Sequence, residues 1–193
     1  MTELATSIRP GLRLPMSWET YDSLDYDDAL RGAEYMDGAL VVPPGLPDWG
    51  HQEAILYLRD QLRPTLRAGE TATTGFGWKP AEVREEYGPD VMVCEIPTDR
   101  RRFTGVPLLC VEVTSSNRAN DLVKKRNAYA AAGLQDYWII DRKEHALRCH
   151  ELRGDVLIET GTFHLPARRR KELTVVVAYA GRPVEVDLTQ LFL

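Results

Sequence analysis

The chain has 193 residues, of which 44% are hydrophobic and 27% charged, and its formal net charge is −5. These values are typical of one folded domain with a full hydrophobic core and exclude a disordered chain. An acidic balance also argues against a protein that holds nucleic acid by charge alone, although local basic clusters remain. No apolar run reaches the roughly eighteen residues that a membrane-spanning helix needs. The N-terminus lacks a secretory signal pattern, so we expect a cytoplasmic protein without a membrane partner.

The three cysteines, Cys94, Cys110 and Cys149, lie far apart in the sequence. Their number is odd, and two of them sit inside apolar, strand-like runs. We therefore predict buried, reduced thiols rather than disulfides or a zinc site. This prediction agrees with a reducing cytoplasm.

The N-terminal region is expected to be irregular before regular structure begins. Residues 1–20 contain two prolines and a glycine and predict an irregular arm. The polar segment 21–31 predicts a short helix. Residues 33–42 (AEYMDGALVV) predict a strand, or a hairpin that turns at Asp37–Gly38, which is a favoured tight-turn pair.

An amphipathic helix is predicted from Asp48 to about Leu66, because its apolar residues recur at helical spacing. Pro64 is expected to kink this helix or to end it early. Residues 71–79 are β-branched and rich in glycine, and they predict a strand. Residues 90–96, 107–114 and 136–141 are short apolar runs without alternation, which favours strands covered on both faces.

A second helix is predicted over residues 119–132, capped by Asn117 or Asn120 and ended by Gly133. In the tail, residues 147–152 and 156–160 predict a hairpin. Two further strands are predicted near 173–179 and at 184–186, and a final turn at 188–192. This order predicts an α/β fold, with a mixed β-sheet flanked by helices and strands added at the C-terminus. We expect residues 21–193 to form one domain.

Two carboxylates stand at the ends of predicted strands. Asp90 precedes the apolar run VMV, and Glu112 is embedded in LLCVEVTSS. A carboxylate inside an apolar strand is costly to bury unless it is paired or binds a cation. Two such acids on adjacent strands could share one divalent ion, and oxygen ligands suit Mg²⁺ or Mn²⁺.

The following helix adds Asp121, Lys125 and Tyr129, which are spaced by four and so share one face. A lysine above the two acids would stabilise the charge that develops on a phosphate, and a metal would activate water. This set predicts metal-assisted phosphodiester hydrolysis. Taken singly, each residue has a plainer interpretation: a turn aspartate, a glutamate paired with an arginine, or an exposed helical stripe.

These segments resemble a known family. PDVMV, VEVTSSNRANDLVKKRNAYAAAGLQDYWIID and the upstream EYMDGALV and WGHQEAILYLRDQL are similar to the Uma-type putative restriction endonuclease family. That family is a bacterial branch of the PD-(D/E)XK nuclease superfamily, whose fold is restriction-endonuclease-like. The resemblance implies Asp90 and Glu112 as metal ligands, Lys125 as the catalytic lysine and Glu34 as a further acid of the metal site. It also implies a DNA substrate and favours a homodimer, because cutting both strands of a duplex needs two sites.

The sequence departs from the superfamily pattern after Glu112, where Val113 and Thr114 follow and no lysine stands two residues on. Lys125 takes that place in the resemblance, and its neighbour Lys124 is the fallback. The backbone carbonyl of Val113 could add a metal ligand without any particular side chain.

The histidines are weaker candidates. His51 opens the first predicted helix, where it could contact a phosphate or orient a ligand, or could simply cap the helix. His145, His150 and His164 show no ligand spacing and are expected at the surface.

Three functions remain open from the sequence. The first is a Mg²⁺- or Mn²⁺-dependent endonuclease acting on DNA. The second is a nuclease fold with weak or lost catalysis that serves as a nucleic-acid or protein binding module. The third is a metal-binding sensor or scaffold, which leaves Lys125 without a role.

Overall fold

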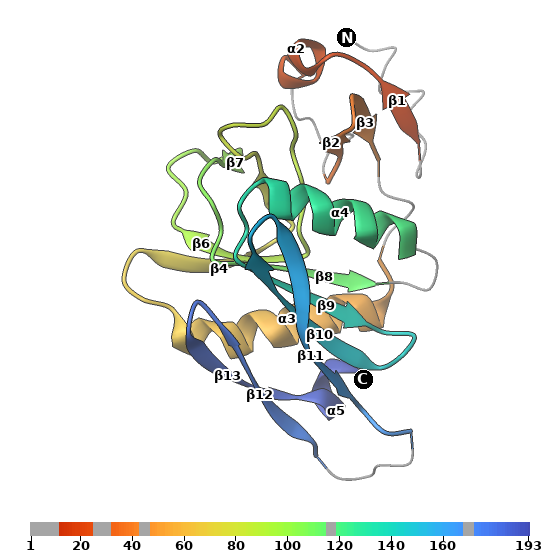
Figure 1. Cartoon of the computed structure of the whole chain (residues 1–193), viewed down its shortest axis with the longest axis vertical. Coiled ribbons are helices and arrows are strands. Elements are labelled where there is room, and N and C mark those ends of the chain that lie inside the picture. The colour runs from red at the N-terminus through yellow and green to blue at the C-terminus, as the bar shows by residue number, and fades with distance from the viewer. Residues whose placement is uncertain (1–11, 25–31, 43–46, 115–118, 168–171) are drawn as a thin grey trace.

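The protein has an α/β fold around a six-stranded mixed sheet, as predicted (Figure 1). The computed structural model describes residues 12–24, 32–42, 47–114, 119–167 and 172–193. The strands of this sheet, in chain order, are β4 (Glu70–Thr74), β6 (Val91–Glu95), β8 (Leu109–Thr114), β9 (Asp136–Asp141), β10 (Ala146–Arg153) and β11 (Val156–His164). Their spatial order is β11-β10-β9-β8-β6-β4. Only the central pair β8–β9 is parallel in this sheet, because α4 connects these two strands.

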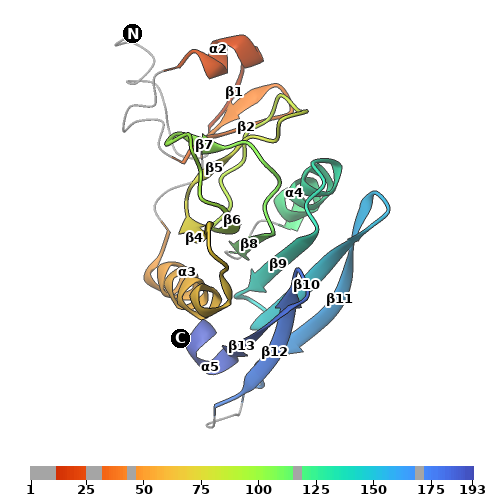
Figure 2. The ribbon, with the colours of Figure 1, turned by 90° about the vertical axis from the view of Figure 1, so that its left-hand side faces the viewer.

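Two helices cover the sheet from opposite faces, α3 (Trp49–Leu62) on one side and α4 (Ala119–Ala131) on the other (Figure 2). Side chains along a strand alternate between the faces. In β6, Val91 and Val93 therefore join the core under α3, while Met92 and Cys94 join the core under α4. By the same alternation in β8, Glu112 points towards α4.

The helix ends follow the local sequence closely. Asp48 caps α3 by accepting a hydrogen bond from the His51 backbone N–H at 2.9 Å. The helix ends at Leu62, and Pro64 lies in the short 3₁₀ turn η2 (Arg63–Thr65), so the predicted early end is confirmed. Gly133 ends α4 with a left-handed φ of 81°. Of the two predicted caps, Asn117 lies outside the described residues and Asn120 lies within the helix.

The predicted irregular arm is wrong for its second half, where the structure forms β1 (Arg13–Pro15) and begins α2 (Trp18–Asp22). β1 pairs with β3 (Ala39–Val41), which also pairs with β2 (Glu34–Met36). The predicted hairpin is confirmed, because Asp37 and Gly38 both have positive φ, as a type I′ turn requires. This small sheet lies at the opposite end of the molecule from the C-terminal strands (Figure 1) and sets the position of Glu34.

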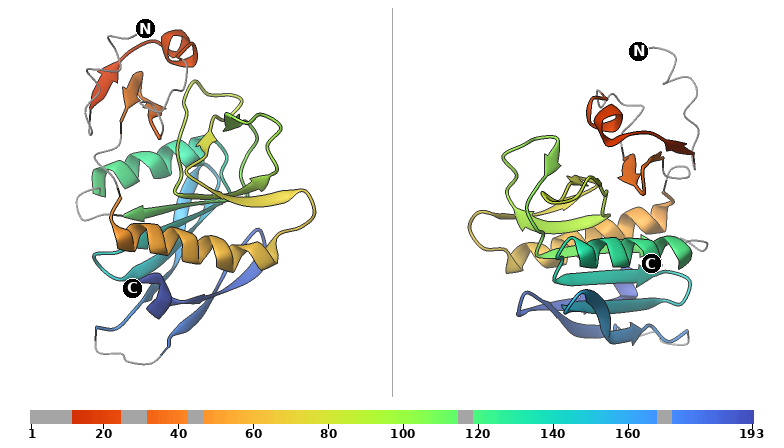
Figure 3. Two further views of the ribbon diagram at one scale, coloured as in Figure 1. Left: turned by 180° about the vertical axis from the view of Figure 1, so that it is seen from behind. Right: turned by 45° about the horizontal axis from the view of Figure 1, so that its top comes forward.

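The C-terminal strands β12 (Thr174–Tyr179) and β13 (Arg182–Asp187) form one hairpin, followed by α5 (Leu188–Leu191). Its turn is Ala180–Gly181, where both residues have positive φ. The hairpin and α5 pack against α3 on the side away from α4 (Figure 3). A short parallel pair, β5 (Gly77–Trp78) and β7 (Arg102–Phe103), borders the core under α4.

Cys94, Cys110 and Cys149 are free and buried, as predicted. His145 and His164 are exposed, but the surface prediction is wrong for His150, which is only 2% exposed. In the described part of the chain, no helix is long and apolar enough to cross a membrane.

Candidate metal-dependent active site

Lys125 joins two glutamates from different sheets beneath α4. Its Nζ donates to Glu34 Oε1 at 2.8 Å and to both carboxylate oxygens of Glu112 at 3.1 Å. All three residues are buried, with exposures of 5–7%. The predicted position of the lysine on the helix following β8 is thus the position from which it reaches both acids.

Tyr129 lies one helical turn after Lys125, and its hydroxyl donates to Glu112 Oε1 at 2.8 Å. Its ring packs against the rings of Trp78, Tyr87 and Tyr137, with centroids 5.1–5.3 Å apart. These contacts hold the hydroxyl in a fixed direction. Tyr129 therefore orients Glu112 while packing in the core, and it lies on the same face of α4 as Lys125, as its spacing predicts.

Asp90 lies at the start of β6, beside Glu112. Val91 pairs with Val111 in the antiparallel ladder of β6 and β8. The residue before Val91, Asp90, therefore lies opposite the residue after Val111, Glu112. Asp90 Oδ2 accepts a hydrogen bond from the Val113 N–H at 2.7 Å, and Asp90 Oδ1 lies 3.2 Å from His51 Nε2. The strand end and the first turn of α3 thus fix the orientation of this carboxylate.

The charges of the cluster do not balance. When all three carboxylates, those of Glu34, Asp90 and Glu112, are ionised, they face one lysine and leave two negative charges in excess. The pKa of Glu112 is raised to about 8, mainly by burial and also by Asp90 and Glu34, against the opposing effect of Lys125. Burial alone would lower the pKa of Lys125, but Glu112 and Glu34 outweigh it and raise that pKa, so the lysine is charged.

The donor set of this cluster fits a divalent cation in chemistry and in charge. Carboxylate oxygens are the ligands that Mg²⁺ and Mn²⁺ prefer, and a doubly charged ion would cancel the excess. Among the described residues, however, no group of three or more His, Cys, Asp and Glu side chains is arranged to hold a metal. Lys125 and Tyr129 hold Glu112, so its carboxylate would have to turn towards Asp90 to share an ion.

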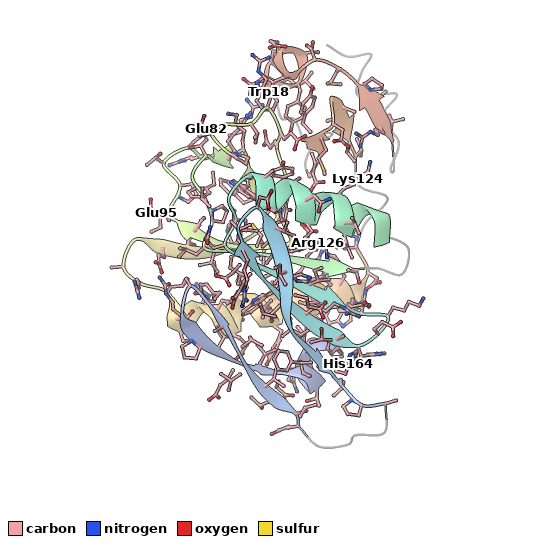
Figure 4. All side chains as sticks on the ribbon, in the orientation of Figure 1. Trp18, Glu82, Glu95, Lys124, Arg126 and His164 are labelled. Carbon is pink, nitrogen blue, oxygen red and sulfur yellow. The ribbon has the colours of Figure 1, made fainter. Side chains whose placement is uncertain are left out.

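Other predicted site residues lie elsewhere or cannot be placed. Lys124 is exposed, lies 3.5 Å from Asp37 and borders a separate cavity of 630 Å³ beside α4. Figure 4 shows it on the side of the helix facing the N-terminal sheet. The structure therefore does not bring Lys124 together with Glu34, Asp90 and Glu112. The side chain of Asp121 lies outside the described residues, and Val113 contacts Asp90 through its N–H, so a role for its carbonyl stays a prediction.

One contact of the site was not anticipated from the sequence. The backbone N–H of Gly88 donates to Glu34 Oε1 at 2.9 Å, the same oxygen that Lys125 contacts. The segment Gly88-Pro89-Asp90 thus contributes one acid of the site, Asp90, and contacts a second, Glu34. No local signal in the sequence predicts this contact, because a Cβ added at Gly88 would lie at an ordinary distance of 3.5 Å from Glu34 Oε1.

Comparison with known proteins gives the family and the fold of the chain. The sequence matches the model of the Uma2 family, described as "putative restriction endonuclease", over residues 18–178. The chain belongs to this family. A solved structure described as a putative nuclease belonging to DUF820, from Anabaena variabilis, superposes with a TM-score of 0.69. The two chains are 18% identical, and the match covers 92% of this chain and 98% of the other. No curated protein matches the sequence. Membership of the Uma2 family indicates a nuclease of the restriction-endonuclease type, and the solved structure shows the same fold.

Proposed function

We propose that this Uma2-family domain, residues 21–193, is a cytoplasmic endonuclease that uses Mg²⁺ or Mn²⁺ to hydrolyse phosphodiester bonds in DNA. The observation that carries the proposal is the buried contact of Lys125 with Glu34 and Glu112. A lysine that served only to neutralise carboxylates would leave no excess charge. Here two negative charges remain when all three carboxylates are ionised, and they sit beside the charged ammonium of Lys125.

Each residue has a role that follows from its contacts. Asp90 and Glu112 would hold the ion, with Glu34 and the Val113 carbonyl completing its ligands. A bound divalent ion would polarise the phosphate and lower the pKa of a water molecule. Lys125 would stabilise the charge that develops on the phosphoryl oxygens. Tyr129 orients Glu112 through its hydroxyl.

The decisive experiment is a cleavage panel with supercoiled plasmid, single-stranded and branched DNA, and RNA, each with Mg²⁺, Mn²⁺ or chelator. We expect plasmid nicking or linearisation that needs the ion. Asp90→Asn should remove it while the circular dichroism spectrum and melting curve stay close to wild type. Absence of ion-dependent cleavage on every substrate would overturn the proposal.

The alternative is a nuclease fold that binds nucleic acid or protein with little or no catalysis. This alternative is supported by the hydrogen bonds from Lys125 and Tyr129 to Glu112, because they hold its carboxylate in an orientation that does not share an ion with Asp90. On this alternative the protein would retard DNA in a gel shift equally with ion or chelator and would not cut it. A sensor or scaffold would instead bind the ion without binding DNA.

A homodimer is also proposed, because a duplex has two strands and each needs a site. Size-exclusion chromatography with light scattering would give twice the chain mass of 21.8 kDa. A monomer that nicks one strand at a time would remove the dimer from the proposal and leave the chemistry intact.

A further inference from the structure

We infer that His51 is a ligand of the catalytic metal ion and that it biases the site towards Mn²⁺ over Mg²⁺. This inference rests on the proposed function, since it concerns the ion that the carboxylates would hold. The structure gives His51 a defined place: Asp48 fixes its backbone N–H at the start of α3. Its side chain is 11% exposed, and Nε2 lies 3.2 Å from Asp90 Oδ1.

The plainer role for His51 is a hydrogen-bond partner that orients Asp90. However, Asp90 is already oriented by the Val113 N–H at 2.7 Å. Two little-exposed carboxylates away from the site are paired with arginine instead: Arg182 contacts Glu70 at 2.6 Å, and Arg102 lies 3.1 Å from Glu86. An imidazole is not a permanent cation, but it carries a lone pair that metals bind.

The spacing of the two atoms supports this choice. Neighbouring ligand atoms around a six-coordinate ion with bonds of about 2.1–2.2 Å lie roughly 3 Å apart. His51 Nε2 and Asp90 Oδ1 lie 3.2 Å apart, a separation that suits a hydrogen bond without the ion and two neighbouring ligand atoms with it. For this, the proton of the neutral ring must sit on Nδ1, which leaves the Nε2 lone pair free for the metal.

An imidazole among the ligands changes which ions the site prefers. Sites made only of oxygen suit Mg²⁺, whereas imidazole favours first-row transition ions. Within that class we commit to Mn²⁺, which shares the octahedral oxygen chemistry of Mg²⁺ and also accepts nitrogen. The expected signature is tighter binding of Mn²⁺ than of Mg²⁺, with His51 responsible for the difference.

The test measures ion binding rather than activity. The full chain is titrated with Mn²⁺ alone and with Mg²⁺ alone by calorimetry, as wild type, His51→Gln and His164→Gln. The glutamine amide can still donate a hydrogen bond to Asp90 but offers no imidazole lone pair. His164 is exposed and lies far from α4 in Figure 4, so His164→Gln is the matched control.

We expect His51→Gln to weaken Mn²⁺ binding by at least about tenfold. Mg²⁺ binding should fall by less, and His164→Gln should bind both ions like wild type. Pulsed electron paramagnetic resonance on the Mn²⁺-loaded wild type should show coupling to a ligand nitrogen. Growth on ¹⁵N-histidine should change this coupling from ¹⁴N to ¹⁵N, a measurement that needs no variant to fold.

The outcomes separate this inference from the proposed function. If wild type binds Mn²⁺ without nitrogen coupling, or His51→Gln keeps its affinity for Mn²⁺, the inference is overturned and the metal-dependent nuclease stands. An equal loss of Mn²⁺ and Mg²⁺ affinity in His51→Gln overturns the selectivity. If neither ion binds wild type more tightly than it binds Asp90→Asn, the proposed metal site itself fails.

Discussion

Glu70 and Glu112 lie on the same sheet, but the groups of charges around these two carboxylates are built in opposite ways. Glu70 on β4 meets Arg182 on β13 in a two-pronged ion pair, with distances of 2.6 and 2.8 Å. One negative charge faces one positive charge, and the pair lowers the pKa of Glu70 to about 2. Around Glu112, three carboxylates face one lysine, and burial raises the pKa of Glu112 to about 8.

The difference separates a structural ion pair from the cluster that we propose as the active site. The Glu70–Arg182 pair joins the C-terminal hairpin to the main sheet, and its charges cancel without any further ligand. The Glu112 cluster stores unfavourable charge, which costs stability and is relieved only by a proton or a cation. Strongly shifted pKa values of this kind concentrate at functional sites. Mutations in the two groups should therefore change different properties.

The largest expected effect is on catalysis. Lys125→Met removes the cation of the Glu112 cluster and should reduce ion-dependent DNA cleavage by at least about 100-fold, because a group that stabilises developing charge is lost. The measurement is the initial rate of plasmid nicking at saturating Mn²⁺. Lys124→Met removes the same charge from the neighbouring exposed position and should keep most of the rate. Equal losses in the two variants would contradict the assignment to Lys125.

The second effect is on stability and should leave chemistry alone. Arg182→Met leaves Glu70 without its partner and should lower the free energy of unfolding by about 2 kcal/mol, between the values typical of exposed and buried pairs. Urea unfolding at pH 7 gives this difference. The affinity for Mn²⁺ should not change. A variant that lost Mn²⁺ affinity but not stability would reverse the roles assigned to the two groups.

Much of the fold could be predicted because local signals specify it. The hairpin at Asp37–Gly38 needs only its turn residues, and the buried strand β9 is a continuous apolar run. The failures came from long-range contacts. Residues Arg13–Pro15 form a strand only because β3 lies beside them, and His150 is buried because it pairs across the sheet with Tyr137.

The candidate site divides in the same way. Glu112 stood out because a carboxylate inside an apolar strand needs a partner, and the helical spacing of Lys125 and Tyr129 placed both on the face that reaches it. Glu34 was found only through the family resemblance, since nothing local in its hairpin shows that it will meet Lys125. The contact of His51 with Asp90 depends on how α3 packs on the sheet, which no spacing in the sequence reveals.

A third test uses the pH dependence of stability without metal. The folded-state pKa of Glu112, about 8, lies above its ordinary value, so its contribution is fully present below about pH 4.5 and is lost as the pH rises through 8. Wild type in chelator should lose about 1 kcal/mol of stability between pH 7 and 9. Glu112→Gln should remove this slope, as seen by urea unfolding at several pH values. Identical slopes in the two proteins would show that Glu112 carries no excess charge.

The smallest effect has the opposite sign and comes from the structural pair. The folded-state pKa of Glu70, about 2, lies below its ordinary value, so its contribution is present above about pH 4.5 and is lost as the pH falls towards 2. With solvent screening, wild type should lose about 0.5 kcal/mol from this group between pH 5 and 3.5. Glu70→Gln should be flatter in that window and parallel to wild type between pH 7 and 9. If Glu70→Gln instead flattened the alkaline slope, the two carboxylate groups would be coupled and the contrast between them would fail.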